Sequence, residues 1–464
     1  MKLPNIFHIS EMKLPARASF FYLLSGVLGK GLGFISTLFF TRLLTTADYG
    51  EYAVYMSWLG IGEACVSAFL SGSIIYKGFS DFKEKSQEFL STLIITFLMF
   101  GTAFCLLLFT FSAFFGFSSF LFPFLFFQII FDGILSINLY EKKHLYKYRT
   151  VVILSISEAA LSIIAALALI KYAGLGFIGR ILGYLIPAVI LGIYYIFRAR
   201  PVKYDKEIFI YIIKKAFTLL PSTVALAISM QADKLIIDSL MGSVSAARYS
   251  VVHSVGVSGI FLVTALGSAL YPWINRKLKS GMYEAILNVT EPLLSFFTSF
   301  SLFLIAVAPI AIRILAPDEY TAALPAFAPL AISLIPYFAA NLNTVYLIHV
   351  GLENKVSKIT VISGILGVLL SVILIRAFGY LGAGLASLFS SIVTYIGGSY
   401  CLNRTKRIQI TPPRRVLSSF LISSVIALLI LLSENLPFFI PLLLIAPALS
   451  LVSSAIKAKR LIFE

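Results

Sequence analysis

Residues 20–44 read FFYLLSGVLGKGLGFISTLFFTRLL, an apolar run in which Lys30 is the first charge and Arg42 the second. A bilayer-spanning helix needs roughly 20 mostly apolar residues, so this run predicts one transmembrane helix. The G-x-x-x-G spacing of Gly29 and Gly33 favours close packing of that helix against another. Working outward, we find about fourteen such runs: 20–44, 53–75, 89–109, 120–140, 151–170, 177–197, 216–240, 249–270, 285–312, 326–350, 359–375, 381–402, 416–432 and 437–455.

The composition supports a membrane protein. Of 464 residues, 59% are hydrophobic and 12% are charged, and the mean hydropathy is +0.95. Soluble domains carry about 25% charged residues, so a soluble enzyme, a disordered chain and a nucleic-acid-binding module are excluded. The three cysteines lie in apolar runs without C-x-x-C spacing. We therefore expect neither a disulfide framework nor a metal site.

The distribution of charge predicts the topology. If the first residue is cytoplasmic and the helices alternate, about 29 of the Lys and Arg residues fall in inside segments and about 4 outside, as the positive-inside rule requires. One missed helix would exchange the downstream loops and destroy this asymmetry. The net charge of +16 is therefore topological, and it does not indicate a nucleic-acid partner. We expect a multi-pass membrane protein with both termini cytoplasmic.

An internal repeat predicts two related halves. LIKYAGLGFIG at 169–179 faces LIRAFGYLGAG at 374–384, an offset of 205 residues. An even offset in helix number makes the repeats parallel, with a cavity between them. The predicted fold is thus an all-α membrane protein of two parallel six-helix lobes around a central cavity, residues 1–200 and 201–405, followed by two extra transmembrane helices in residues 406–464.

The first hairpin resembles the opening of the polysaccharide flippases. Their first helix typically ends in R-x-L-x-x-x-x-Y-G-x-Y, which Arg42, Leu44, Tyr49, Gly50 and Tyr52 match here. The segment QADKLIIDSLMGSVSAARYSVV at 231–252 resembles the seventh-to-eighth turn of the same family, except that Arg248 stands where glycine usually precedes the tyrosine. The chain is similar to the O-antigen type flippases of the multidrug/oligosaccharidyl-lipid/polysaccharide superfamily.

The resemblance implies a transporter and not an enzyme. Such a flippase moves an undecaprenyl-pyrophosphate-linked oligosaccharide, an O-antigen (lipopolysaccharide) or other polysaccharide repeat unit, from the cytoplasmic to the periplasmic leaflet by alternating access. Its partners are the lipid-linked oligosaccharide, membrane lipids and other polysaccharide assembly proteins. A lipid II flippase or a cation-coupled drug exporter of the same fold is the alternative. A glycan polymerase or ligase is a distant third, because no outside loop is long enough for it.

Three cations within spans are candidates for binding the anionic headgroup, because a charge in mid-membrane costs at least about 2.5–3.5 kcal/mol. Lys30 and Lys234 occupy nearly equivalent faces of equivalent helices, and Arg180 suits a bidentate phosphate contact. Structural alternatives remain for each. Lys30 can pair with Glu63, Lys234 with Asp238 four residues on, and Arg180 can anchor its helix at the membrane surface.

Four carboxyl groups within spans are candidates for ion coupling: Glu63, Asp132, Glu158 and Asp233. A buried carboxyl group can carry a proton or Na⁺ through alternating access. The alternative is that these groups neutralise the buried cations. The chain has no Walker motif and no H-E-x-x-H, and we expect no cofactor beyond a coupling ion.

Overall fold

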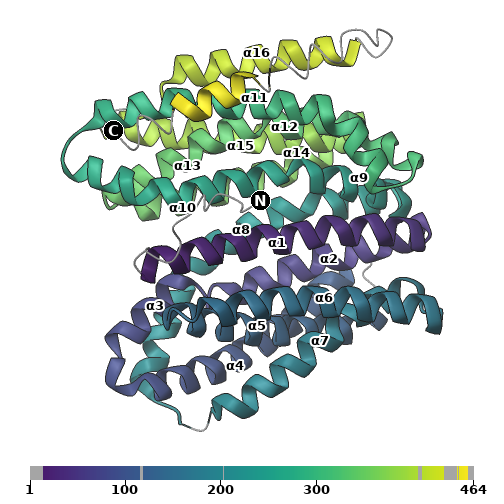
Figure 1. Ribbon diagram of the computed structural model, residues 1–464, viewed down its shortest axis with the longest axis vertical. Coiled ribbons are helices and arrows are strands. Elements are labelled where there is room, and N and C mark those ends of the chain that lie inside the picture. The colour runs from purple at the N-terminus through teal and green to yellow at the C-terminus, as the bar shows by residue number, and fades with distance from the viewer. Residues whose placement is uncertain are drawn as a thin grey trace, which may run out of the picture. The chain divides into compact units, whose positions relative to one another are not determined.

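The computed structural model describes residues 14–114, 119–201, 203–405, 410–432, 447 and 449–457. All regular structure in these residues is helical (Figure 1), and eleven segments among them are long and apolar enough to cross a membrane. The predicted all-helical membrane fold is confirmed. The number of fourteen spans is not, and most of the last expected span, 437–455, lies outside the described residues.

The first part of the chain forms these helices: α1 (Leu14–Leu43), α2 (Thr46–Ser67), α3 (Gly72–Asp81), α4 (Ser86–Phe114), α5 (Phe122–His144), α6 (Tyr148–Ala173) and α7 (Gly176–Ala199). The second part continues with α8 (Lys206–Met241), α9 (Ser243–Gly256), α10 (Ser258–Lys279), α11 (Tyr283–Leu315), α12 (Phe327–Ile332), α13 (Leu334–His349), α14 (Glu353–Phe378), α15 (Tyr380–Arg404) and α16 (Pro413–Leu432).

Several expected spans are interrupted helices. The run 53–75 is divided between α2 and α3, and the Ser71 hydroxyl accepts a hydrogen bond from the Ile74 N–H where α3 begins. The run 249–270 is divided at Val257 between α9 and α10. Ser and Thr side chains satisfy backbone groups freed at such breaks, which is why apolarity alone does not reveal them.

The chain divides into two compact units, Met1–Val224 and Ala225–Glu464. The boundary falls inside α8, the helix that contains Pro221. Each unit is described by itself below. The predicted lobes at 1–200 and 201–405, the cavity between them and the separate segment 406–464 stay predictions.

Close helix packing in the first unit depends on Gly183. A Cβ atom placed there would lie 2.3 Å from the Ala166 Cα of the neighbouring helix α6. By contrast, a Cβ at Gly29 or Gly33 meets no described atom within 4 Å. The close contact expected from the G-x-x-x-G run is therefore not formed there. It occurs between α6 and α7, which lie side by side in Figure 1.

We expect Gly183→Val to destabilise the protein more than Gly33→Val does. Both substitutions put the same branched residue into a helix, but only the first forces backbone apart, and overpacking a core typically costs about 1–3 kcal/mol. Thermal unfolding of the purified variants in detergent measures the difference. Equal melting temperatures would contradict the tight α6–α7 contact.

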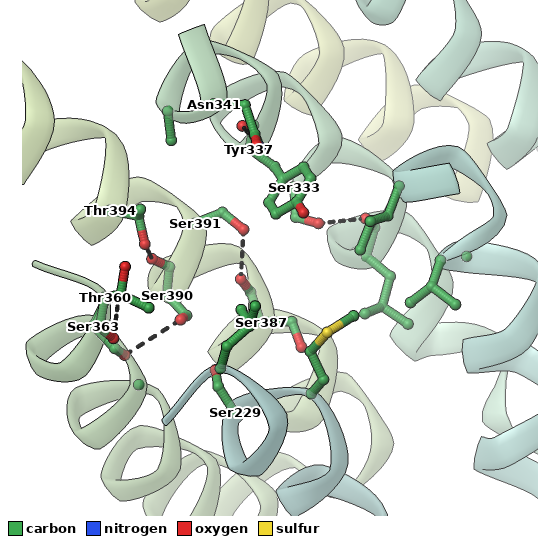
Figure 2. Close-up of a pocket in the computed structure, with 18 of the residues that line it drawn as sticks. Ser229, Ser333, Tyr337, Asn341, Thr360, Ser363, Ser387, Ser390, Ser391 and Thr394 are labelled. Atoms are coloured by element: carbon green, nitrogen blue, oxygen red, sulfur yellow. Dashed lines mark hydrogen bonds between the residues drawn. The ribbon is translucent and has the colours of Figure 1, made fainter. Parts of the chain in front are cut away.

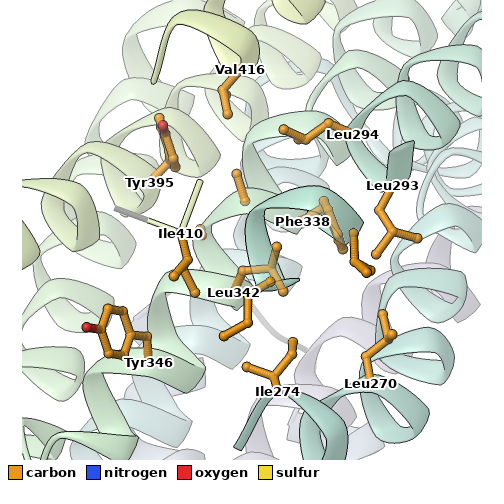
Figure 3. Packing of buried hydrophobic residues seen from close by; sticks show 14 of the residues in the cluster. Leu270, Ile274, Leu293, Leu294, Phe338, Leu342, Tyr346, Tyr395, Ile410 and Val416 are labelled. Atoms are coloured by element: carbon orange, nitrogen blue, oxygen red, sulfur yellow. The ribbon is translucent and has the colours of Figure 1, made fainter. Parts of the chain in front are cut away.

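The second unit has a large apolar core between α10, α11, α13, α15 and α16 (Figure 3). Phe297, Ile335 and Leu402 are fully buried in it. Three buried polar side chains are hydrogen-bonded beside this core. The Asn343 amide donates to Ser399 Oγ at 3.0 Å and accepts from the Thr411 hydroxyl at 2.8 Å. The buried amide is thus satisfied by α15 and by the segment before α16, which fixes their register against α13.

Asp205 links the start of α8 to α4 within the first unit through hydrogen bonds and an ion pair. Its Oδ2 accepts from Lys85 Nζ at 2.9 Å, and its Oδ1 accepts from the Glu207 and Ile208 N–H groups. Its own N–H donates to the Thr92 hydroxyl at 3.0 Å. The Lys85 ammonium, followed by these backbone N–H groups, lowers the pKa of Asp205 below its ordinary value.

Asp205→Asn should lower the melting temperature at neutral pH. The substitution keeps the capping oxygen but removes the charge. Because the folded-state pKa is depressed, the ion pair contributes fully above the ordinary carboxyl value of about 3.9 and is lost as the pH falls through the folded-state pKa. The difference from wild type should therefore be constant near pH 7 and shrink below about pH 3.9. Glu207→Gln is the matched control, and no difference at pH 7 would refute the linking role.

Candidate functional site

Three of the predicted carboxyl groups meet inside the first unit. Glu63 lies on α2, Asp132 on α5 and Glu158 on α6. The Glu63 and Asp132 side chains are in hydrogen-bonding contact, and Glu158 is within electrostatic range of both. The Gln128 amide donates to Asp132 Oδ2 at 2.7 Å. Because α2, α5 and α6 are separate in sequence, only the folded bundle brings these groups together.

This carboxyl cluster has acceptor atoms without donors. Gln128 Oε1 and the Tyr55 hydroxyl are buried and have no hydrogen-bond partner among the described residues, and no described N–H or O–H donates to Asp132 Oδ1. None of the three carboxyl groups forms an ion pair with a described side chain. Two adjacent carboxylates cannot both stay charged at low cost in a buried site, so we expect the Glu63–Asp132 pair to share a proton.

We expect infrared difference spectra at neutral pH to reveal that proton. The spectrum of wild type minus that of the double variant Glu63→Gln/Asp132→Asn should contain a protonated-carboxyl band, because the variant lacks the pair that shares the proton. Asp205→Asn, which replaces the carboxyl group whose pKa Lys85 lowers, should lose only carboxylate bands. A double variant that loses two carboxylates and no protonated band would show that both groups are ionised.

Asp233 on α8 is the fourth predicted carboxyl group, and it lies in the second unit. It is 3% exposed and accepts three hydroxyl hydrogen bonds. Ser371 donates to Oδ1 at 2.5 Å, while Ser387 and Tyr249 donate to Oδ2 at 2.8 and 3.2 Å. Three donors satisfy a buried carboxylate without a cationic partner, and the same oxygens are of the type that Na⁺ and other hard cations bind.

Lys234 follows Asp233 on α8 but makes a different contact. Its ammonium donates to Gln231 Oε1 at 3.1 Å, and it forms no ion pair with Asp238 among the described residues. The pairing with Asp238 considered from the sequence is therefore wrong. Lys234 and the buried His253 lie within electrostatic range of each other. Asp233 is also within electrostatic range of Lys234. A lysine whose one described hydrogen bond goes to a neutral amide keeps donors available for an anion.

Arg180 is buried near the start of α7. It is 7% exposed, so the surface-anchoring alternative is wrong. One guanidinium nitrogen donates to Ser36 Oγ at 2.7 Å. The plane lies 4.0 Å from the Phe40 ring centroid and 5.1 Å from that of Tyr52. Nε and Nη1 have no partner among the described residues, which leaves donors suited to an oxyanion.

Lys30 lies within α1, and its side chain is outside the described part of the structure. The alternative that Lys30 pairs with Glu63 therefore stays open. Arg180 contacts α1 and α2 and does not join the carboxyl cluster. The roles proposed for Lys30, Lys234, Arg180 and the four carboxyl groups stay predictions.

The sequence reasoning missed the neutral groups of these sites. Gln128 and Tyr55 flank the carboxyl cluster, and Ser371, Ser387 and Tyr249 surround Asp233. Uncharged polar residues are common in membrane helices, so single positions give no signal. The spacing of Gln128 four residues before Asp132 was the one available clue, because such residues face each other on a helix.

The second unit also contains a cavity of about 270 Å³. Its lining comes from α8, α9, α10, α12, α13, α14 and α15, and many of its side chains are hydroxyls (Figure 2). Ser387 lines this cavity and also binds Asp233. His253, a buried residue, also lines the cavity.

The fold is that of known membrane transporters. The chain aligns with a structure titled lipid II flippase MurJ in an inward closed conformation, with TM-score 0.73, 16% identity, and coverage of 94% of this chain and 98% of that one. It also aligns with inward-facing and outward-facing multidrug resistance MATE transporters of the MOP superfamily, with TM-scores of 0.57 and 0.56 and identities of 12% and 13%. These alignments cover 80% and 88% of this chain and 98% and 100% of the transporters. The protein is therefore a multi-span helical membrane protein with the fold shared by these flippases and exporters.

The family follows from the sequence. Residues 16–277 match the family described as polysaccharide biosynthesis protein, and the chain belongs to that family. The resemblance to polysaccharide flippases is thereby confirmed. No curated protein matches the chain.

Proposed function

We propose that this protein flips an undecaprenyl-pyrophosphate-linked oligosaccharide, an O-antigen or other polysaccharide repeat unit, from the cytoplasmic to the periplasmic leaflet of the bacterial inner membrane by alternating access. The observation that carries the proposal is the family match over residues 16–277 in a chain with a flippase fold. In this proposal both termini are cytoplasmic. The partners are the lipid-linked oligosaccharide, membrane lipids and other polysaccharide assembly proteins.

The headgroup is bound by cations within the spans. Arg180 supports this role because its guanidinium keeps two nitrogens without partners among the described residues, and Lys234 supports it because its one described hydrogen bond goes to a neutral amide. Lys30 is the third proposed contact, from its position in α1. A pyrophosphate offers several oxyanions to such donors, and charge-assisted hydrogen bonds are about twice as strong as neutral ones.

Transport is coupled to a cation. Glu63, Asp132 and Glu158 exchange a proton in the first unit, and Asp233 with its hydroxyl groups binds H⁺ or Na⁺ in the second. The support for the first site is the contact between the Glu63 and Asp132 carboxyl groups, together with the absence of a described N–H or O–H donor to Asp132 Oδ1. The support for the second is the set of oxygen atoms around Asp233.

Glycan export in cells tests the headgroup contacts. Arg180→Ala and Lys234→Ala should each reduce export at least about tenfold, because a lost charge-assisted hydrogen bond costs about 1.5–3 kcal/mol. Arg180→Lys should retain part of the activity. Lys171→Ala removes an exposed cation near the end of α6 and should export normally.

Normal export by both alanine variants, at normal protein levels, would remove the headgroup role. The substrate class is tested separately by expressing the protein in cells depleted of their peptidoglycan-precursor flippase. Restored growth would favour the lipid II alternative over the glycan repeat unit.

A further inference from the structure

The cavity of the second unit has an unusual lining for a space between apolar helices. Among the described residues that line it, none is Lys, Arg, Asp or Glu. Ser363 and Thr360 on α14 and Ser390 and Thr394 on α15 lie on one side (Figure 2). Ser333, Tyr337 and Asn341 lie on another side of the same space (Figure 2).

The hydrogen atoms of the four hydroxyls on α14 and α15 are already used in hydrogen bonds to backbone carbonyls. Thr360 donates to the Val356 carbonyl at 3.0 Å and Thr394 to the Ser390 carbonyl at 2.9 Å. Ser363 donates to the Thr360 carbonyl at 3.1 Å and Ser390 to the Ser363 carbonyl at 3.3 Å. A hydroxyl has one hydrogen and two lone pairs, so each of these groups retains only acceptor capacity.

The amide differs. Asn341 Nδ2 donates one hydrogen to the Tyr337 carbonyl at 2.9 Å, which leaves one N–H donor and the Oδ1 acceptor. Ser387 donates its hydrogen to Asp233. At Thr360, Ser363, Ser390, Thr394 and Ser387 an occupant must therefore supply the hydrogen. A phosphate or pyrophosphate supplies none when ionised, and the described lining contains no Lys or Arg to neutralise it.

The remaining surface is apolar. Leu226, Met230, Val257 and Ile260 contribute to the lining. A group that carries several O–H donors around a ring of C–H groups matches both kinds of surface, which a lipid tail or an inorganic anion does not. The volume of about 270 Å³ is just below the roughly 300–1,000 Å³ of sites for drug-sized ligands, so the cavity suits one small ring.

We propose that this cavity binds one uncharged sugar ring, which donates its hydroxyl hydrogens to the oxygens of Thr360, Ser363, Ser390 and Thr394. The sugar is a unit of the lipid-linked oligosaccharide, so the inference rests on the proposed function. It adds a glycan site separate from the cations proposed to bind the pyrophosphate.

Saturation-transfer NMR with the full-length protein in nanodiscs tests the site directly. The probes are the methyl glycosides of glucose, galactose and N-acetylglucosamine. Thr360→Val/Thr394→Val removes two acceptors at nearly constant shape and should weaken binding at least about fivefold, since two hydrogen bonds contribute about 0.5–1.5 kcal/mol each. Thr360→Ser/Thr394→Ser retains the oxygens and should restore binding.

Thr298→Val is the matched control. Thr298 also lies on a helix of the second unit and donates to a backbone carbonyl, that of Leu294 at 2.7 Å, but it does not line the cavity. This variant should bind glycosides as wild type does, and inorganic pyrophosphate should not compete.

Four outcomes would overturn the proposal: no signal from any glycoside, unchanged binding by the double valine variant, equal loss in Thr298→Val, or competition by pyrophosphate. Loss of glycoside binding when NaCl replaces choline chloride would show that Na⁺ occupies the cavity. This result would also overturn the proposal. Flipping of a lipid-linked glycan by wild type in proteoliposomes is measured separately. Glycoside binding without flipping would refute the proposed function, whereas flipping without glycoside binding would refute only the sugar site.

Discussion

Polar groups inside apolar helices must find partners within the protein, because lipid supplies none. This constraint governs every site described above. Asp233 is satisfied by three hydroxyls, and Asn343 by Ser399 and Thr411. Where a partner is absent, as at Asp132 Oδ1 and at two nitrogens of Arg180, the structure retains a group that is costly unless a proton or ligand satisfies it. The unsatisfied groups are therefore the best guide to function.

The two units meet the constraint by different means. In the first, carboxyl groups from α2, α5 and α6 gather around a glutamine and a tyrosine, so a proton can replace a missing partner. In the second, serines and threonines bind the carbonyls of their own helices, so most hydroxyls are satisfied locally. A proton taken up by the carboxyl groups of the first arrangement changes their charge, whereas the serine and threonine hydroxyls of the second carry none.

The sequence predicted the helical class and the position of most helices, because apolar runs of bilayer length are a strong signal. It did not predict the break at Val257 or the division between α2 and α3, since neither interrupts the apolar pattern. The repeated glycines at 29 and 33 suggested a close contact that Gly183 makes instead, and only the three-dimensional packing distinguishes them. The charged site residues stood out individually, yet the contact between Glu63 and Asp132 and the burial of Arg180 required the fold. Neutral partners such as Ser371 and Tyr249 carried no signal, because their residue types are frequent in membrane helices.

The hydroxyls that are satisfied by their own helices have an evolutionary consequence. Exchanging Ser, Thr, Ala or Val at position 360, 363 or 394 alters which oxygens face the cavity but leaves no partner on another helix without its hydrogen bond. Such positions can drift under selection for a new ligand while the surrounding bundle keeps its stability. Related chains that differ at these three positions would then share one architecture and diverge in what they accept.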